Sequence, residues 1–278
     1  MPRIKSLAEG HPLIFSLAIT FLFILLVLVS SIMANRIYPA GTPGWYMVGL
    51  AGRLVSIFIL LFALSRLGWL ETAGFSSSGS RQAWFLALPA LAYSIAVSAF
   101  AMTGNLDFSF SGPVLVVSAS LFLMAQAFLE ETAFRDLVIH DFVPAWGGTS
   151  RGLLRSIVIS SVFYGGDHIL YLAGEPSTVV LWRILVASLM GVLFGALVLR
   201  GQSIYPAAFF HGAWNVAGYL NLIRNGLEGT TYSWLLLCLF TLSLAIYGLF
   251  LLRGFTRHYP HTSRSLRMEL PGHGHDLT

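Results

Sequence analysis

The chain has 278 residues, of which 56% are hydrophobic and only 10% are charged, and its mean hydropathy is +0.76. Soluble domains average about 25% charged residues, so a single water-facing globule is excluded and a lipid bilayer is the expected solvent. The net charge of +4 does not indicate nucleic-acid binding, because the basic residues lie mostly between apolar runs. Lys5 is the only lysine, which excludes a Walker-type phosphate loop. Cys238 is the only cysteine, which excludes an intrachain disulfide or a multi-cysteine metal site.

Eight apolar runs approach the roughly 20 residues that a transmembrane helix needs. They are 13–34, 48–67, 84–102, 114–139, 154–164, 179–199, 204–222 and 234–252. The first run follows basic residues, but it is longer than the roughly 7–15 residues of a signal-peptide core, so it is predicted to be an uncleaved helix. The fifth run is short and leads into Gly165-Gly166. Fusing the fifth run with the sixth would give seven helices instead of eight.

The distribution of basic residues favours eight spans and predicts their orientation. With eight spans both termini lie on one side, which collects twelve of the basic residues. The other side collects only Arg36, Arg53, Arg183 and Arg224. Basic residues gather on the cytoplasmic side of membrane proteins, so both termini are predicted to be cytoplasmic.

The predicted fold is therefore all-α, a polytopic transmembrane bundle of about eight helices. Residues 1–255 are expected to form one helical domain and residues 256–278 a polar cytoplasmic tail. Gly191 and Gly195 are four residues apart in the sixth run, a spacing that lets a second helix approach closely.

The first polar cluster lies late in the fourth run, at Glu130-Glu131-Thr132-Ala133-Phe134-Arg135. Ionisable residues inside a span are costly and therefore indicate a functional site. Glu131 and Arg135 are four residues apart and are expected to pair on one helix face, which leaves Glu130 to act as a general base on water. The alternative is a helix end at the membrane surface, where all three side chains simply meet water.

Two further clusters lie on later helices. Tyr164 and His168 share a face if the fifth helix continues through its glycines. His211 and Asn215 share a stripe of the seventh helix, and both can donate hydrogen bonds to an oxyanion formed at an attacked carbonyl. The alternatives are a structural histidine for the first pair and interhelical hydrogen bonds for the second.

The three clusters, in this order, resemble the CAAX protease and bacteriocin-processing family, which includes the type II CAAX prenyl endopeptidases. The family pattern is Glu-Glu-xxx-Arg, then Phe-xxx-His, then His-xxx-Asn/Asp, and the resemblance covers about residues 121–222. Three positions depart from it: Tyr164 replaces the usual phenylalanine, Asp136 stands where glycine is common, and Asp167 replaces a small or aliphatic residue.

The resemblance implies an intramembrane endopeptidase that cuts a peptide or membrane-protein substrate. Glu130 and His168 would activate water, His211 and Asn215 would stabilise the oxyanion, and Glu131, Arg135 and Tyr164 would shape the site. A mechanism without a cofactor is preferred. The alternative is zinc held by Glu130, His168 and His211.

Two other functions compete with the protease. A non-catalytic scaffold or immunity protein is disfavoured because every proposed catalytic side chain is present. A transporter with a proton relay is disfavoured because no inverted repeat is evident. The protein is expected in the plasma membrane, with the lipid bilayer and a peptide as its partners and no nucleic acid. The substrate and the oligomeric state are not predicted.

Overall fold

The computed structural model describes residues 8, 10–70, 73–75, 81–101, 112–146, 149–225 and 231–253. Within these residues every regular element is helical. The predicted polar tail, residues 256–278, and the basic residues before the first helix lie outside the described part.

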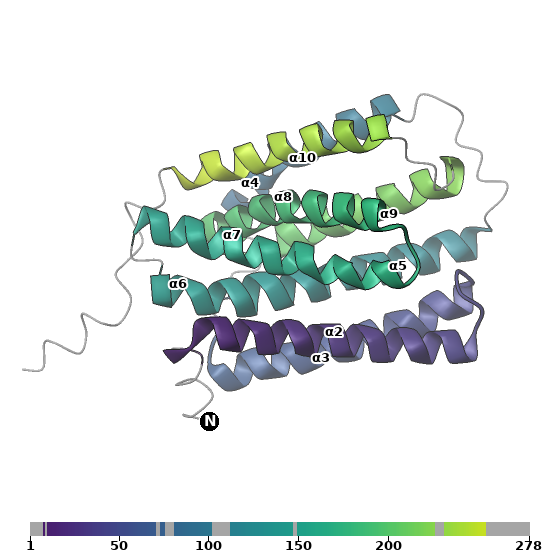
Figure 1. Ribbon diagram of the computed structural model, residues 1–278, viewed down its shortest axis with the longest axis horizontal. Coiled ribbons are helices and arrows are strands. Elements are labelled where there is room, and N and C mark those ends of the chain that lie inside the picture. The colour runs from purple at the N-terminus through teal and green to yellow at the C-terminus, as the bar shows by residue number, and fades with distance from the viewer. Residues whose placement is uncertain are drawn as a thin grey trace, which may run out of the picture.

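Eight long helical rods make up the bundle in the described part, and Figure 1 shows them lying along one common direction. In chain order they are α2 (Pro12–Ile37), α3 (Pro43–Leu67), α4 (Arg81–Ala101), the rod of α5 (Pro113–Glu131), η2 (Thr132–Ile139) and α6 (His140–Trp146), the rod of α7 (Ser150–Gly166) and η3 (Asp167–Ala173), α8 (Ser177–Gly201), α9 (Tyr205–Asn225) and α10 (Thr231–Leu252). Because α7 with η3 is separate from α8, the seven-helix alternative is wrong.

Local sequence marks several helix boundaries. Helix α3 begins with Pro43 in its first turn, and the Thr42 side chain caps it by accepting a hydrogen bond from the Trp45 backbone N–H. It ends at Gly68, whose φ of 72° places it in the left-handed region that favours glycine. Proline also begins α2 and α5. These signals explain why the helices begin and end near the predicted positions.

Six of the rods are long and apolar enough to cross a bilayer, counted over the described residues. Large apolar side chains such as Phe21 and Phe58 point outward and are 68% and 70% exposed, which suits lipid contact and not water. Helices α4 and α9 complete the eight rods, and α9 carries polar His211 and Asn215 in its middle. The all-α membrane bundle predicted from the sequence is confirmed.

Helix α8 lies at the centre of the bundle. Of its most apolar stretch 67% is buried, against 28–39% in the other five candidate spans. It packs against α7 and α10, while α5 packs against α3 and α9. A Cβ at Gly191 would lie 2.9 Å from Ser161 on α7, so this glycine provides the close helix approach predicted from its spacing.

The first rod begins and the last rod ends at the same end of the bundle. Figure 1 shows the beginning of α2 and the end of α10 both at the left, as an even number of rods requires. Two of the basic residues counted in the comparison of the two membrane sides lie inside helices. Arg53 lies inside α3 and is 3% exposed, and Arg135 lies inside η2 and is 1% exposed. Neither is a flanking charge, because both are buried in the bundle. The cytoplasmic orientation of the ends stays a prediction.

Candidate active site

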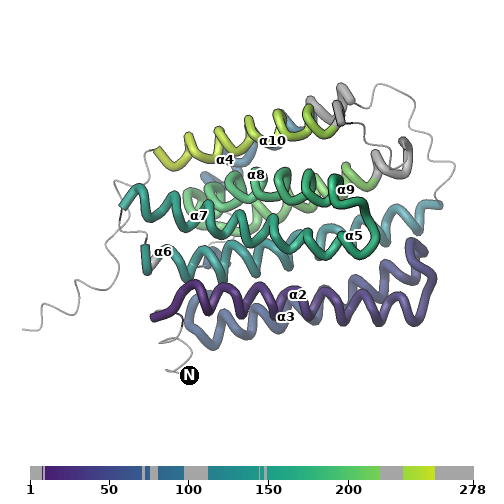
Figure 2. Tube along the Cα trace, viewed as in Figure 1, coloured from purple at the N-terminus to yellow at the C-terminus, as the bar shows by residue number. Residues whose placement is uncertain are grey.

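The two glutamates lie in the middle of a rod and are buried. Glu130 is 7% exposed and Glu131 is fully buried, so the alternative of a water-exposed helix end is wrong. The rod continues through Trp146, and Figure 2 shows α5 and α6 as parts of one tube. The pair was expected near the end of the helix; instead the chain extends the helix well beyond it. The site therefore lies inside the bundle.

A π-helix begins directly after Glu131 and covers Thr132–Ile139. Its hydrogen bonds run from residue i to i+5, so each turn is wider than an α-helical turn, and such turns are rare and frequent at functional sites. All eight of its residues are buried. Arg135 and Asp136 lie in this wide segment, so the helix face that they present differs from the one that α-helical spacing predicts.

Glu131 links two of the predicted clusters. Its Oε2 lies 3.1 Å from Nε of Arg135, which confirms the predicted pair. Its Oε1 accepts a hydrogen bond from Nδ1 of His211 at 2.9 Å. The same carboxylate therefore balances a buried guanidinium and fixes the orientation of an imidazole on another helix.

Arg135 interacts with its surroundings mainly through charge and aromatic faces. Its guanidinium carbon lies 4.2 Å from the ring centre of Tyr164 and 5.4 Å from that of Phe194. Its nitrogens make no hydrogen bond to the described residues, because the contact with Glu131 is not aligned as one. Cation–π contacts of this kind gain strength when they are removed from water.

His211 is the central residue of the site and is 2% exposed. Its Nε2 lies 3.0 Å from the Tyr164 hydroxyl and 3.4 Å from Oε2 of Glu130. Because Glu131 accepts at Nδ1, that nitrogen carries a proton. In the neutral ring Nε2 therefore accepts from Tyr164, and in the imidazolium form it is a donor. Phe194 stacks on the ring, with 5.0 Å between the ring centres.

Tyr164 joins the second and third clusters. Its hydroxyl contacts His211, and its ring packs edge-on against His168, with 5.7 Å between the ring centres. A phenylalanine, usual in the family pattern, would keep the ring contact and lose the hydroxyl. The departure at this position therefore adds a hydrogen bond within the site and removes no contact.

His168 is held by its neighbour in the chain. Its Nδ1 lies 2.6 Å from Oδ1 of Asp167 and 3.3 Å from the Tyr164 carbonyl oxygen. It makes no direct hydrogen bond with Glu130, whose imidazole neighbour is His211. Asp167, which also departs from the family pattern, therefore orients His168. The ring follows α7 in the first turn of the 3₁₀-helix η3.

The predicted site residue Asn215 and Asp136, which departs from the family pattern, lie near this cluster without joining it. Asn215 is one turn after His211 on α9 and is partly buried. It makes no hydrogen bond to the described residues, so its amide is available to a ligand. Asp136 is 1% exposed, and neither of its carboxylate oxygens has a hydrogen-bond partner in the described part.

Glycines let the helices around the site approach one another closely. A Cβ at Gly165 would lie 2.7 Å from the Ile184 carbonyl oxygen of α8, and one at Gly212 would overlap the Met124 side chain of α5. Contacts below 3.0 Å require a neighbour to move. Gly212 thus lets α9 approach α5 directly beside His211, which explains how His211 reaches both glutamates.

The zinc alternative stays untested by the arrangement. Among the described residues, no group of three or more His, Cys, Asp or Glu side chains is already gathered around a common point. Within the predicted set Glu130 and His211 are in contact, and Asp167 holds Nδ1 of His168 while leaving Nε2 of that ring for a ligand. No step of the proposed chemistry is therefore derived through a metal.

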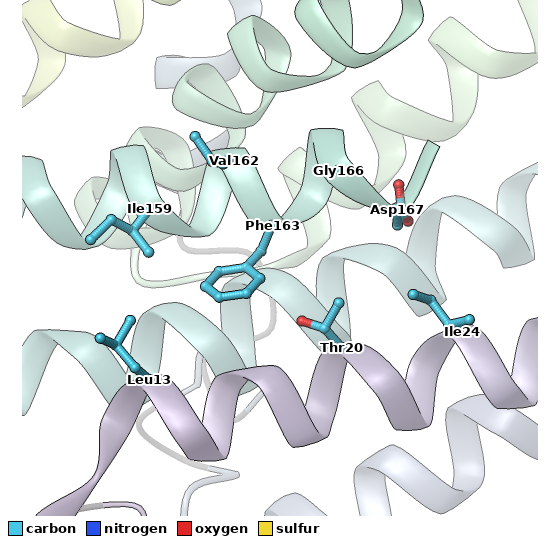
Figure 3. A pocket seen from close by; sticks show the side chains of 8 residues that line it. All are labelled: Leu13, Thr20, Ile24, Ile159, Val162, Phe163, Gly166 and Asp167. Carbon is cyan, nitrogen blue, oxygen red and sulfur yellow. The ribbon is translucent and has the colours of Figure 1, made fainter. Parts of the chain in front are cut away.

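An apolar groove of about 430 Å³ lies between α2 and α7. Figure 3 shows Leu13, Thr20 and Ile24 on α2 facing the α7 side chains, with Asp167 at one end. Asp167 is the residue that holds His168. The groove therefore reaches Asp167, next to the second cluster of Tyr164 and His168.

Two functional candidates were missed by sequence reasoning. Gln126 donates to Oε1 of Glu130, and Arg53 of α3 donates to Oε1 of Gln126. Gln126 lies four residues before Glu130, so its spacing was a usable signal. Arg53 was counted as a basic residue on one side of the membrane, although it lies within the second apolar run.

The comparisons with known proteins support the family. Residues 112–217 match the family described as type II CAAX prenyl endopeptidase Rce1-like. This region contains all the motif residues named above, and it confirms the resemblance that the three motifs indicated. No curated protein and no solved structure matches the chain.

Proposed function

We propose that this chain, whose residues 112–217 match the type II CAAX prenyl endopeptidase Rce1-like family, is an intramembrane endopeptidase in which Glu130 activates a water molecule. The observation that carries the proposal is the contact between three helices: Glu130 of α5, Tyr164 of α7 and His211 of α9 meet in one buried cluster. A carboxylate beside an imidazole, closed off from bulk water, suits peptide hydrolysis.

The two carboxylate oxygens of Glu130 have different surroundings. Its Oε1 accepts from Gln126, while Oε2 faces His211 at 3.4 Å. In the proposed reaction Oε2 takes a proton from water, and the water oxygen attacks the carbonyl carbon of the substrate. When the tetrahedral intermediate collapses, the carbon–nitrogen bond breaks and the Glu130 carboxyl gives the proton to the leaving amine. The products are a carboxylic acid and an amine.

Donors for the oxyanion come from α9. The amide of Asn215 is available, and Nε2 of His211 donates when the ring carries its second proton. Glu131 supports this role by accepting at Nδ1, so that the ring cannot rotate away. His168, oriented by Asp167, is assigned to binding the substrate or water on the α7 side of the site.

The test is hydrolysis of a quenched fluorescent peptide library by the purified protein in detergent. Glu130→Gln keeps the size of the side chain and removes the base, so activity should fall by about 10²-fold or more. Glu175→Gln is the matched control, because Glu175 pairs with Arg183 at the surface of the bundle. Wild-type rates in the Glu130→Gln variant would exclude the glutamate mechanism.

A chelator separates the two mechanisms. Activity that persists in the presence of a chelator supports direct water activation by Glu130. Loss of activity that zinc restores would replace this mechanism with a metal-dependent one. Library cleavage also reports the sequence preference of the enzyme, and repeating it with a prenylated peptide tests whether the lipid is required.

A further inference from the structure

Arg53 is a buried cation outside the family motifs. It lies eleven residues into α3, is 3% exposed, and all three of its guanidinium nitrogens donate hydrogen bonds. On α2 they reach the Ser30 hydroxyl, the Val27 carbonyl oxygen at 3.3 Å and the Ser31 hydroxyl at 3.3 Å. On α5 the Nε–H reaches Gln126. A cation inside a membrane bundle is costly, so its retention with a full set of partners indicates a specific role.

The side-chain amide of Gln126 can bond to both Arg53 and Glu130 in only one orientation. Arginine has only donors, so the carbonyl oxygen of the Gln126 amide must face Arg53. The NH₂ group of the amide is thereby turned toward Oε1 of Glu130, to which it donates. Glu130 must therefore accept at this oxygen, and its other oxygen is left facing His211.

The same link balances charge. The glutamate pair brings two buried carboxylates together, and Glu131 already has Arg135 as its partner. Arg53 is the second buried guanidinium and is connected to Glu130 through one amide. Each glutamate of the pair thus has its own guanidinium, from two different helices. An uncompensated carboxylate would be strongly disfavoured at this depth.

We propose that Arg53 and Gln126 are positioning residues that fix the carboxylate of Glu130 and balance its charge. The positioning part rests on the proposed function, whereas the charge part does not depend on catalysis. Neither residue touches the reacting atoms. Their effect on the reaction is exerted through Oε1 of Glu130, which they hold so that Oε2 stays directed at the site.

The charge part is tested by a thermal-stability cycle of Arg53→Gln and Glu130→Gln in detergent. Arg53→Gln alone leaves Glu130 unbalanced and should lower the melting temperature by several degrees. In the Glu130→Gln background the same change should cost less than half as much, because no carboxylate remains to balance. Equal losses in both backgrounds would overturn the charge assignment. Arg66→Gln, at the exposed end of the same helix, is the control.

If Arg53→Gln does not fold, the double variant Arg53→Gln with Glu130→Gln carries the charge test: recovery of folding supports the charge assignment and failure to recover overturns it. Arg53→Lys tests the positioning role separately. Lysine keeps the charge but cannot form the planar fork that joins α2 and α5. Arg53→Lys should therefore keep most of the thermal stability while reducing kcat as Gln126→Leu does. A lysine variant as active as the wild type would overturn the positioning role of the guanidinium.

The positioning part is tested by steady-state kinetics of Gln126→Leu. Leucine fills similar space without the amide, so kcat should fall at least tenfold while KM changes less than threefold. The acid limb of the pH–rate profile, which reports the catalytic base, should shift as well. Gln126→Glu presents a like charge to Glu130 and should reduce kcat further. A change in melting temperature with an unchanged kcat and pH profile would reduce Gln126 to a structural role.

The proposed function and the roles of Arg53 and Gln126 can be refuted independently of each other. If Glu130→Gln retains wild-type activity, the proposed function is wrong, but the stability cycle still reports whether Arg53 balances Glu130. If Glu130→Gln is inactive and Gln126→Leu is fully active, the function stands and the positioning role is refuted.

Discussion

Replacing Arg135 with methionine removes a buried cation while keeping much of the side-chain volume. The guanidinium is 1% exposed, lies 3.1 Å from Oε2 of Glu131 and covers the Tyr164 ring at 4.2 Å. Breaking a buried ion pair by removing one partner costs about 3–5 kcal/mol. Loss of a desolvated cation–π contact alone accounts for about 2 kcal/mol, and the two estimates overlap because the same charge makes both contacts. We expect the free energy of unfolding to fall by about 3–5 kcal/mol.

Equilibrium unfolding in mixed detergent measures this loss, with Arg66→Met as the exposed reference variant. The decisive comparison is the double variant Arg135→Met with Glu131→Gln. With the carboxylate of Glu131 replaced by an amide, the charge that Arg135 balances is removed as well, and the amide oxygen can still accept from His211. The double variant should be more stable than Arg135→Met alone, so the two effects should not add. A loss below about 1 kcal/mol, or strict additivity, would refute the account of Arg135 as the charge partner of Glu131.

Three further predictions concern helix packing, the Tyr164 hydroxyl and the orientation of the chain. Gly165→Ala should destabilise the bundle by about 1–3 kcal/mol, because its Cβ meets the Ile184 carbonyl oxygen; Gly166→Ala, where a Cβ meets open space, should be neutral or stabilising by up to about 1 kcal/mol in the same unfolding assay. Tyr164→Phe removes one hydrogen bond worth about 0.5–1.5 kcal/mol and should lower kcat by about tenfold at most; a complete loss of activity would make the hydroxyl part of the reaction. A reporter fused after Thr278 should be active in the cytoplasm, and activity on the opposite side would reverse the predicted orientation.

The sequence was sufficient for those parts of the site that depend on local spacing. Glu131 and Arg135 pair because residues four apart share a face, and this contact is present at 3.1 Å. The helical runs were also predictable, because a bilayer requires long uninterrupted apolar segments. Their boundaries follow Pro43, Gly68 and similar residues that begin or end helices whatever the tertiary structure.

Contacts between helices were less predictable. His211 was paired with Asn215 by spacing, yet its hydrogen bonds reach Glu131, 80 residues away in the chain. That contact depends on how closely α9 approaches α5, which is set by Gly212 against Met124. The joint role of Glu130 and His168 depended on family analogy and stays a prediction, whereas the contact of Asp167 with His168 follows from their adjacency in the chain.

The π-helix carried no sequence signal. Residues 132–139 contain neither glycine nor proline, the residues that usually mark a helix irregularity. Arg53 was misplaced for a different reason. A charge within an apolar run can flank a helix or lie within one, and only the position of α3 distinguishes the two. The buried relay to Glu130 was therefore visible only once α2, α3 and α5 were placed together.

The wide turns after Glu131 affect how this helix can change length during evolution. An α-helical turn closes between residues i and i+4, whereas the segment 132–139 closes between i and i+5. Deleting one residue after Arg135 can narrow a wide turn to an ordinary one, so that α6 keeps its orientation. The segment between Gln126 and Glu130 has no wide turn that could absorb a deletion. Deleting one residue there would rotate the carboxylate by about 100° relative to the Gln126 amide. Single-residue length variants are therefore expected to be tolerated on one side of the glutamate pair and rejected on the other.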